Sequence, residues 1–127
     1  MTATAGLSRI GQIAVIARDF ERAVSFYRDT LQITFLFNVS NKLAFFDCDG
    51  VRLLVDIPED KEFEHHGSVI YFAVDDIQQM HQTLVSRGVA FRQGPHLIAR
   101  LADREVWMAF FYDSEGNTMA LMAEPKI

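Results

Sequence analysis

Cysteine is nearly missing from this chain of 127 residues, and basic residues are few. With Cys48 as the one cysteine, no disulfide can form within the chain, so a reducing cytoplasm is the natural expectation. Lysine and arginine number 12 against 17 aspartates and glutamates, for a formal net charge of −5. That balance argues against a protein that binds the phosphate backbone of nucleic acids.

Long apolar runs are absent as well. The longest strongly apolar run, Val106 to Tyr112, is far shorter than the roughly 20 residues that a membrane-spanning helix needs. The first eight residues lack the basic region and apolar stretch of a secretory signal. We therefore expect an acidic cytoplasmic protein with no membrane and no nucleic acid among its partners.

An internal repeat organises what the sequence does contain. Each copy has an apolar stretch, an aspartate in the position of a helix N-cap, and apolar residues at helical spacing. These features are Ile10–Ala17, Asp19 and Phe20–Leu31 in the first copy, and Val69–Val74, Asp76 and Ile77–Val85 in the second. Tyr27 of the first copy corresponds to Leu84 of the second.

Each predicted helix is followed by three predicted strands. The last two form a β-hairpin in both copies, with a glycine in the turn. The hairpins are Leu43–Asp47 with Val51–Ile57 around Gly50, and Val106–Tyr112 with Thr118–Ala123 around Gly116. Phe45 and Phe46 thereby correspond to Phe110 and Phe111. The remaining strands are expected at Thr34–Asn38 and within Val89–Arg100, where Gly94-Pro95 interrupts the second.

The repeat predicts an α+β fold made of two βαβββ modules. Residues 8–57 form the first module, residues 58–67 a charged connector, and residues 68–124 the second module, all within one compact domain. One such unit cannot close its own sheet. Two units side by side form a curved eight-stranded mixed sheet, with the helices outside and a concave pocket inside.

With these features the chain resembles the vicinal oxygen chelate superfamily, which includes glyoxalase I, bleomycin-resistance proteins and extradiol dioxygenases. The segments that carry the resemblance are Ile13–Leu31, Val69–Gly88 and Ala109–Glu124. The resemblance implies a glyoxalase/dioxygenase-like fold and a homodimer. It also implies that metal-dependent members hold one divalent ion with a ligand from each of four strands.

By the same resemblance, the four ligand positions are Gln12, Leu54, Val69 and Ala120, where the family has histidine, glutamate or occasionally glutamine. Three of these side chains are aliphatic and offer no donor atom to a cation. We therefore expect no metal and no cofactor in the pocket.

Strand alternation indicates which neighbours share the concave face with those positions. The candidate ligand-binding residues are Gln12, Arg52, Leu54, Tyr71, His96, Trp107, Thr118, Ala120 and Met122. Arg52 and Asp56 either contact a ligand or simply pair and hydrate at the sheet edge. Trp107 either belongs to the core or, if it faces inward, offers a flat platform; the sequence does not indicate which face of the strand carries Trp107 or Glu105.

Three functions are compatible with this pattern. The leading hypothesis is a metal-free binding protein that sequesters a small organic molecule, as the resemblance to bleomycin-resistance proteins implies; the acidic charge would favour a cationic ligand. The alternative is an enzyme of the same superfamily (lyase, isomerase or dioxygenase) that uses relocated metal ligands or acid–base catalysis by His96 and Glu105 with Tyr71. The third is a protein with a filled pocket that acts through its dimer.

Other reactive side chains have plainer explanations. His65 and His66, with Glu62 and Glu64, resemble a metal cluster by composition only, and a solvated loop is the simpler interpretation. Cys48 lies between two aspartates, which oppose formation of a thiolate. Gln32 stands where relatives usually have glycine after the first helix.

Overall fold

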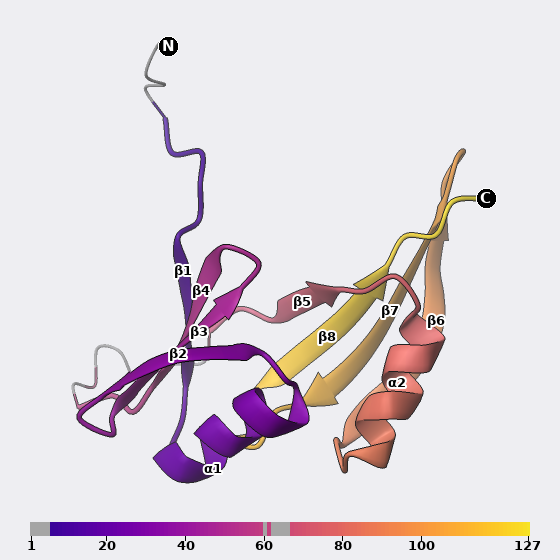
Figure 1. The fold of residues 1–127 in the computed structure, drawn as a ribbon. Helices are drawn as coiled ribbons and strands as arrows, with labels where there is room; N and C mark the ends of the chain where they lie inside the picture. The colour runs from indigo at the N-terminus through magenta and orange to yellow at the C-terminus, as the bar shows by residue number, and fades with distance from the viewer. Residues whose placement is uncertain (1–5, 60, 62–66) are drawn as a thin grey trace.

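The computed structural model describes residues 6–59, 61 and 67–127, and these form two βαβββ modules that follow one another along the chain (Figure 1). Module one contains β1 (Gln12–Ile16), α1 (Phe20–Ser25), η1 (Phe26–Thr30), β2 (Thr34–Val39), β3 (Leu43–Cys48) and β4 (Val51–Asp56). Module two contains β5 (Ile70–Ala73), α2 (Ile77–Ser86), β6 (Phe91–Arg100), β7 (Glu105–Tyr112) and β8 (Thr118–Ala123).

Both helices begin at the aspartate that the sequence indicates. The Asp19 side chain accepts a hydrogen bond from the amide of Arg22, and the Asp76 side chain accepts one from the amide of Gln79. These bonds satisfy amide groups that have no partner within the first turn of a helix. The α2 helix ends before Gly88, whose φ of +87° suits glycine.

The first helix differs from a regular α-helix in its second half. After Ser25 it widens into η1, a π-helical stretch in which the amide of Leu31 donates to the carbonyl of Phe26, five residues earlier. The chain then leaves through Gln32 with a φ of +58°, in the left-handed region.

The eight strands form mixed sheets with matching topology in the two modules, which confirms the predicted α+β fold of two βαβββ units. Over the described residues, the strands are hydrogen-bonded as two four-stranded sheets and not as one continuous sheet of eight. The strand orders are β1-β4-β3-β2 and β5-β8-β7-β6. In each sheet the first strand of the module pairs in parallel with the last, and the remaining pairs are antiparallel.

Strand pairing supports the repeat register residue by residue. Phe45 lies opposite Leu54 in module one, and Phe110 lies opposite Ala120 in module two. The hairpin turns fall at Gly50 and Gly116 as predicted, both with positive φ. Strand β6 carries several register shifts near Gly94-Pro95, where the sequence predicted an interruption.

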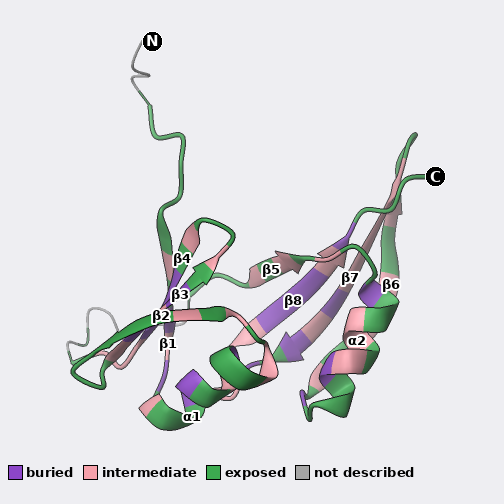
Figure 2. Ribbon diagram, viewed as in Figure 1, coloured by how far each residue is buried: buried purple, intermediate pink, exposed green. Residues whose placement is uncertain are grey.

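One face of each sheet packs against the helices and forms the core. Val55 and Phe46 in module one, and Phe111 and Leu121 in module two, are almost fully buried there together with Tyr27 of η1. Figure 2 shows that β8 is largely buried, whereas the outer strand β2 is largely exposed. The opposite face of each sheet carries no packed helix among the described residues, and we call it the helix-free face.

None of the helices in the described part of the chain is long and apolar enough to cross a membrane.

Candidate functional site

The helix-free face of module one carries a stack of two aromatic rings and a guanidinium group. Phe37 and Phe45 stack with ring centroids 4.5 Å apart and planes inclined by 23°. The guanidinium carbon of Arg52 lies 5.4 Å from the centroid of the Phe45 ring, within the range of a cation–π contact. Arg52 makes no ion pair with any residue that the structure describes. Phe37 is 43% exposed and Arg52 is exposed as well, so an incoming molecule can reach the stack.

The helix-free face of module two carries a second aromatic group at the corresponding place. Phe110 contacts Tyr71 edge-on at 6.1 Å between centroids, and His96 lies 6.1 Å from the same ring on its other side. Tyr71 is 44% exposed. The Nδ1 atom of His96 lies 2.9 Å from the carbonyl oxygen of Gly94, which fixes the ring orientation. Aromatic surface with a few polar groups is typical of small-molecule sites.

The four positions that metal-binding relatives would use do not fit a cation in this chain. Ala120 and Leu54 are buried on the helix-free faces beside Phe110 and Phe45, and Val69 immediately precedes β5. None of these three side chains has a donor atom, and Gln12 alone offers a neutral oxygen. No group of three or more His, Cys, Asp or Glu side chains comes together in the described ranges.

The structure brings most of the sequence-predicted site residues to the helix-free faces. Register pairs Gln12 with Arg52 in module one, and it sets Tyr71 beside Ala120 in module two. By strand alternation, the remaining members on these faces are Leu54, Thr118, Met122 and His96.

Trp107 and Glu105 lie on the opposite face of β7, toward the core. Trp107 pairs with Ala123 and packs against the buried cluster, so of the two alternatives left open for it the structure supports the core and not the platform. Its indole Nε1 donates to Oε1 of Glu105 at 3.1 Å, and Arg100 donates to the other carboxylate oxygen. These bonds lower the pKa of Glu105, and the hydrogen bond from Trp107 has the largest effect. His96 faces the other way, so the hypothetical His96–Glu105 acid–base pair does not form.

Three aromatic residues of these faces were missed as ligand candidates: Phe37, Phe45 and Phe110. The repeat contained the signal for two of them, because it aligns Phe45 with Phe110 on central strands. Alternation from Leu54 and Ala120 across the hairpins would have assigned both to the same face as the former ligand positions.

The other reactive side chains stay in modest roles. Burial, followed by the charges of Asp47 and Asp49, raises the pKa of the Cys48 thiol, which disfavours the thiolate. Burial also raises the pKa of Asp56, which lies on the helix-free face opposite Leu43. His65, His66, Glu62 and Glu64 lie outside the described residues.

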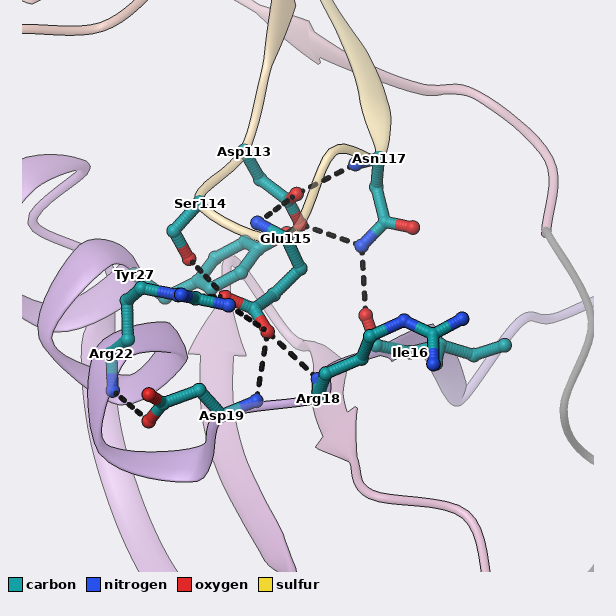
Figure 3. A network of polar contacts seen from close by, with 9 residues as sticks. All are labelled: Ile16, Arg18, Asp19, Arg22, Tyr27, Asp113, Ser114, Glu115 and Asn117. Atoms are coloured by element: carbon teal, nitrogen blue, oxygen red, sulfur yellow. Dashed lines mark hydrogen bonds and ion pairs between the residues drawn. The ribbon is translucent and has the colours of Figure 1, made fainter.

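A polar cluster joins the two modules away from these faces (Figure 3). We call it the clasp: the β7–β8 loop residues Asp113, Glu115 and Asn117, with their partners in module one. Oε1 of Glu115 accepts the amides of Arg18 and Asp19 at 2.7 and 2.9 Å, and its other oxygen accepts Nε of Arg22 at 2.7 Å.

Two further contacts complete the clasp. The buried hydroxyl of Tyr27 donates to Asp113 at 2.6 Å, and Nδ2 of Asn117 donates to the carbonyl of Ile16 at 2.8 Å. Burial, then the negative charge and hydrogen bond of Asp113, raises the pKa of Tyr27 well above 10. Because its carboxylates are saturated with donors, the clasp is a structural joint and not a reactive centre.

The paired modules, with helices on one face of each sheet and aromatic groups on the other, define a class of protein built on duplicated βαβββ units. The chain belongs to the Glyoxalase/Bleomycin resistance protein/Dioxygenase superfamily, whose family model matches residues 9–122.

Solved structures share the fold at low sequence identity. TnmS3, an antibiotic binding protein from Streptomyces sp. CB03234, is 22% identical with a TM-score of 0.74, over 96% of this chain and 100% of that one. Lactoylglutathione lyase from Agrobacterium tumefaciens is 21% identical with a TM-score of 0.71, over 92% and 94%. A member of the superfamily from Alicyclobacillus acidocaldarius is 17% identical with a TM-score of 0.71, over 95% of each chain. A comparison with curated proteins finds no match.

Proposed function

We propose that this protein binds a small organic molecule on its helix-free faces, without a metal ion, and acts by sequestering it. One observation carries the proposal: the corresponding residues Phe45 and Phe110 each present an aromatic group beside an aliphatic residue, Leu54 or Ala120, at a position that the family resemblance assigns to a metal ligand. Both places present flat apolar surface and no donor atoms, and such surface favours binding by contact over coordination.

The polar groups around these rings would orient the ligand. On module one, Arg52 offers guanidinium donors above the Phe45 ring. On module two, the hydroxyl of Tyr71 and the imidazole of His96 flank Phe110. A ligand with an apolar ring system and a few hydrogen-bonding substituents suits this combination.

Two further features belong to the proposal. The similarity to TnmS3, which is described as antibiotic binding, supports a xenobiotic or secondary metabolite as the ligand class. We also propose that the protein works as a cytoplasmic homodimer, because the exposed apolar residues on the helix-free faces, such as Phe37 and Tyr71, would gain cover from a second copy.

Binding without turnover is tested by calorimetric titration of the dialysed protein with a panel of antibiotics. We expect at least one saturable ligand, recovered chemically unchanged after release. Phe45→Ala and Phe110→Ala should each weaken binding at least tenfold, whereas Val85→Ala, on the exposed side of α2, should not change it.

Elemental analysis of the same preparation decides the metal question. Near-stoichiometric iron, manganese, nickel or zinc surviving dialysis would contradict the metal-free mode of binding. Conversion of the ligand to a product would contradict sequestration and favour an enzyme.

A further inference from the structure

An apolar cavity lies between the two modules on their helix-bearing side, away from the helix-free faces. Its volume is about 190 Å³. Leu31 and Ile33, which follow η1, contribute the wall from module one. Phe72 and Val74 of the β5 region and Met80 of α2 contribute the wall from module two. The cavity therefore exists only where the modules meet.

The floor of the cavity is part of the buried core. Leu84, Phe111 and Leu121 line it, and each is at most 3% exposed. Among the residues that the structure describes, no charged side chain lines the cavity, and the side chains of its walls are hydrocarbon and aromatic apart from the thioether of Met80. A charged or strongly polar molecule would lose its hydration there without receiving hydrogen bonds from side chains.

We propose that this cavity is a second binding site, specific for a small uncharged apolar molecule. The molecule would have one aromatic ring, two fused aromatic rings, or an alkyl group of similar size. An apolar cavity of about 150 Å³ lined by Leu, Ile and Phe takes up benzene, so the size and the apolar lining here suit such a guest. The site is separate from the helix-free faces, because Phe72 and Phe111 belong to the core-facing side of the sheet.

Occupancy should also stabilise the joint between the modules. The walls come from both modules, so a guest contacts both at once and binds the folded pairing but not the unfolded chain. The clasp is a purely polar joint, and the cavity is an apolar gap in the same boundary. The guest would fill that gap.

The direct test uses toluene and indole as probes on the unaltered protein. We expect saturable chemical-shift changes for the methyl groups of Met80, Leu84 and Leu31, with no change for those of Leu36 and Leu97, which are exposed elsewhere. We also expect the melting temperature to rise by about 5 °C at ten times the dissociation constant. The absence of saturable binding, or shifts at the exposed leucines instead, would overturn the proposal.

Filling the cavity gives the second test. Val74→Phe and Ile33→Phe fill it from opposite walls and should each weaken indole binding at least tenfold. The matched control Val85→Phe adds the same ring on the exposed side of α2 and should leave binding unchanged. Phe45→Ala, which tests the helix-free face, should also leave it unchanged, so the two sites can fail independently. Undiminished binding in either folded filling variant would refute the site.

Discussion

Tyr27 and Leu84 occupy corresponding positions in the two repeats, but only the tyrosine ties its helix to the other module. Both are buried. The hydroxyl of Tyr27 reaches Asp113, whereas Leu84 has no polar atom to offer to Asp47, the counterpart of Asp113. Arg22, which binds Glu115, likewise corresponds to the uncharged Gln79. Substitutions at single positions have thus made the joint between the modules one-sided.

Glu115 gives this joint a defined pH dependence. Burial acts to raise the pKa of Glu115, but hydrogen bonds from Arg22 and from the amides of Asp19 and Arg18 outweigh it and lower the pKa from 4.5 to about 2. The folded protein therefore holds this proton less tightly than the unfolded chain. The stabilisation is fully present above pH 4.5 and is lost as the pH falls toward 2. It amounts to at most about 3 kcal/mol.

Urea unfolding of the wild type and of Glu115→Gln between pH 2 and 7 measures this contribution. The difference between the two free energies of unfolding isolates Glu115 from the other carboxylates that titrate in the same range. It should be largest above pH 5 and shrink at lower pH. A difference that is constant with pH, or that grows toward acid, would contradict the assignment.

At the scale of whole elements, the sequence predicts regular features well and local irregularities poorly. The N-caps at Asp19 and Asp76 and the hairpin glycines follow from local chemistry, and the structure confirms them. The π-helical stretch η1 was not predicted, since it has the same apolar spacing as an α-helix and differs only in its hydrogen-bond pattern. Its length sets where the chain leaves the helix.

The candidate site was predictable to the extent that strand alternation fixes faces. Alternation placed Tyr71 and Thr118 correctly relative to Ala120. It could not place Trp107, because the run from Val106 to Tyr112 is apolar on both faces and shows no period. In such a strand only the pairing with β8 decides which side chains face the helix.

The exit from the first helix supplies a prediction for a single element junction. Gln32 adopts a φ of +58°, a conformation that costs a residue with a Cβ about 1 kcal/mol or more. Gln32→Gly removes this strain, but glycine has a greater entropy in the unfolded chain, which offsets part of the gain. The free energy of unfolding should therefore rise by about 0.5 kcal/mol.

Chemical denaturation checks this expectation against a matched control. Gln82→Gly, on the exposed side of α2, makes the same substitution at a helical residue and should lower the stability by about 1 kcal/mol. The two variants should therefore differ in sign. Destabilisation by Gln32→Gly would show that its side chain contributes more than the strain costs.

At the scale of the whole molecule, the two modules are joined by one hydrophobic cluster and by a small set of polar contacts. The helices and strands of each module contact mainly elements of the same module. Across the boundary the described polar contacts are those of the clasp and one bond from Arg87 to the carbonyl of Thr30. The apolar cavity occupies part of the remaining boundary. Buried residues of both modules also form one hydrophobic cluster, so cooperativity between the modules should depend on the clasp together with this shared core.

Weakening the clasp should loosen the coupling between the unfolding of the two modules. In Tyr27→Phe/Glu115→Gln the hydroxyl bond to Asp113 and the charge that holds Arg22 are both removed, while the interior of each sheet is untouched. The single tryptophan, Trp107, lies in module two, so its fluorescence reports that module alone. Far-UV circular dichroism reports both modules. In the wild type the two urea transitions should coincide, and in the double variant they should separate.

The control for this experiment removes an ion pair that lies within one module. Arg100→Gln breaks the pair between Arg100 and Glu105, which belongs entirely to module two. Its side chain is 69% exposed, so the loss of stability should be small, and the two transitions should still coincide. Coincident transitions in the clasp variant would mean that the shared apolar contacts around Tyr27 and Phe111 are sufficient to couple the modules when these polar contacts of the clasp are removed. Separated transitions in the control would mean that tryptophan fluorescence senses local fraying of β7, because Glu105 also accepts the indole hydrogen bond.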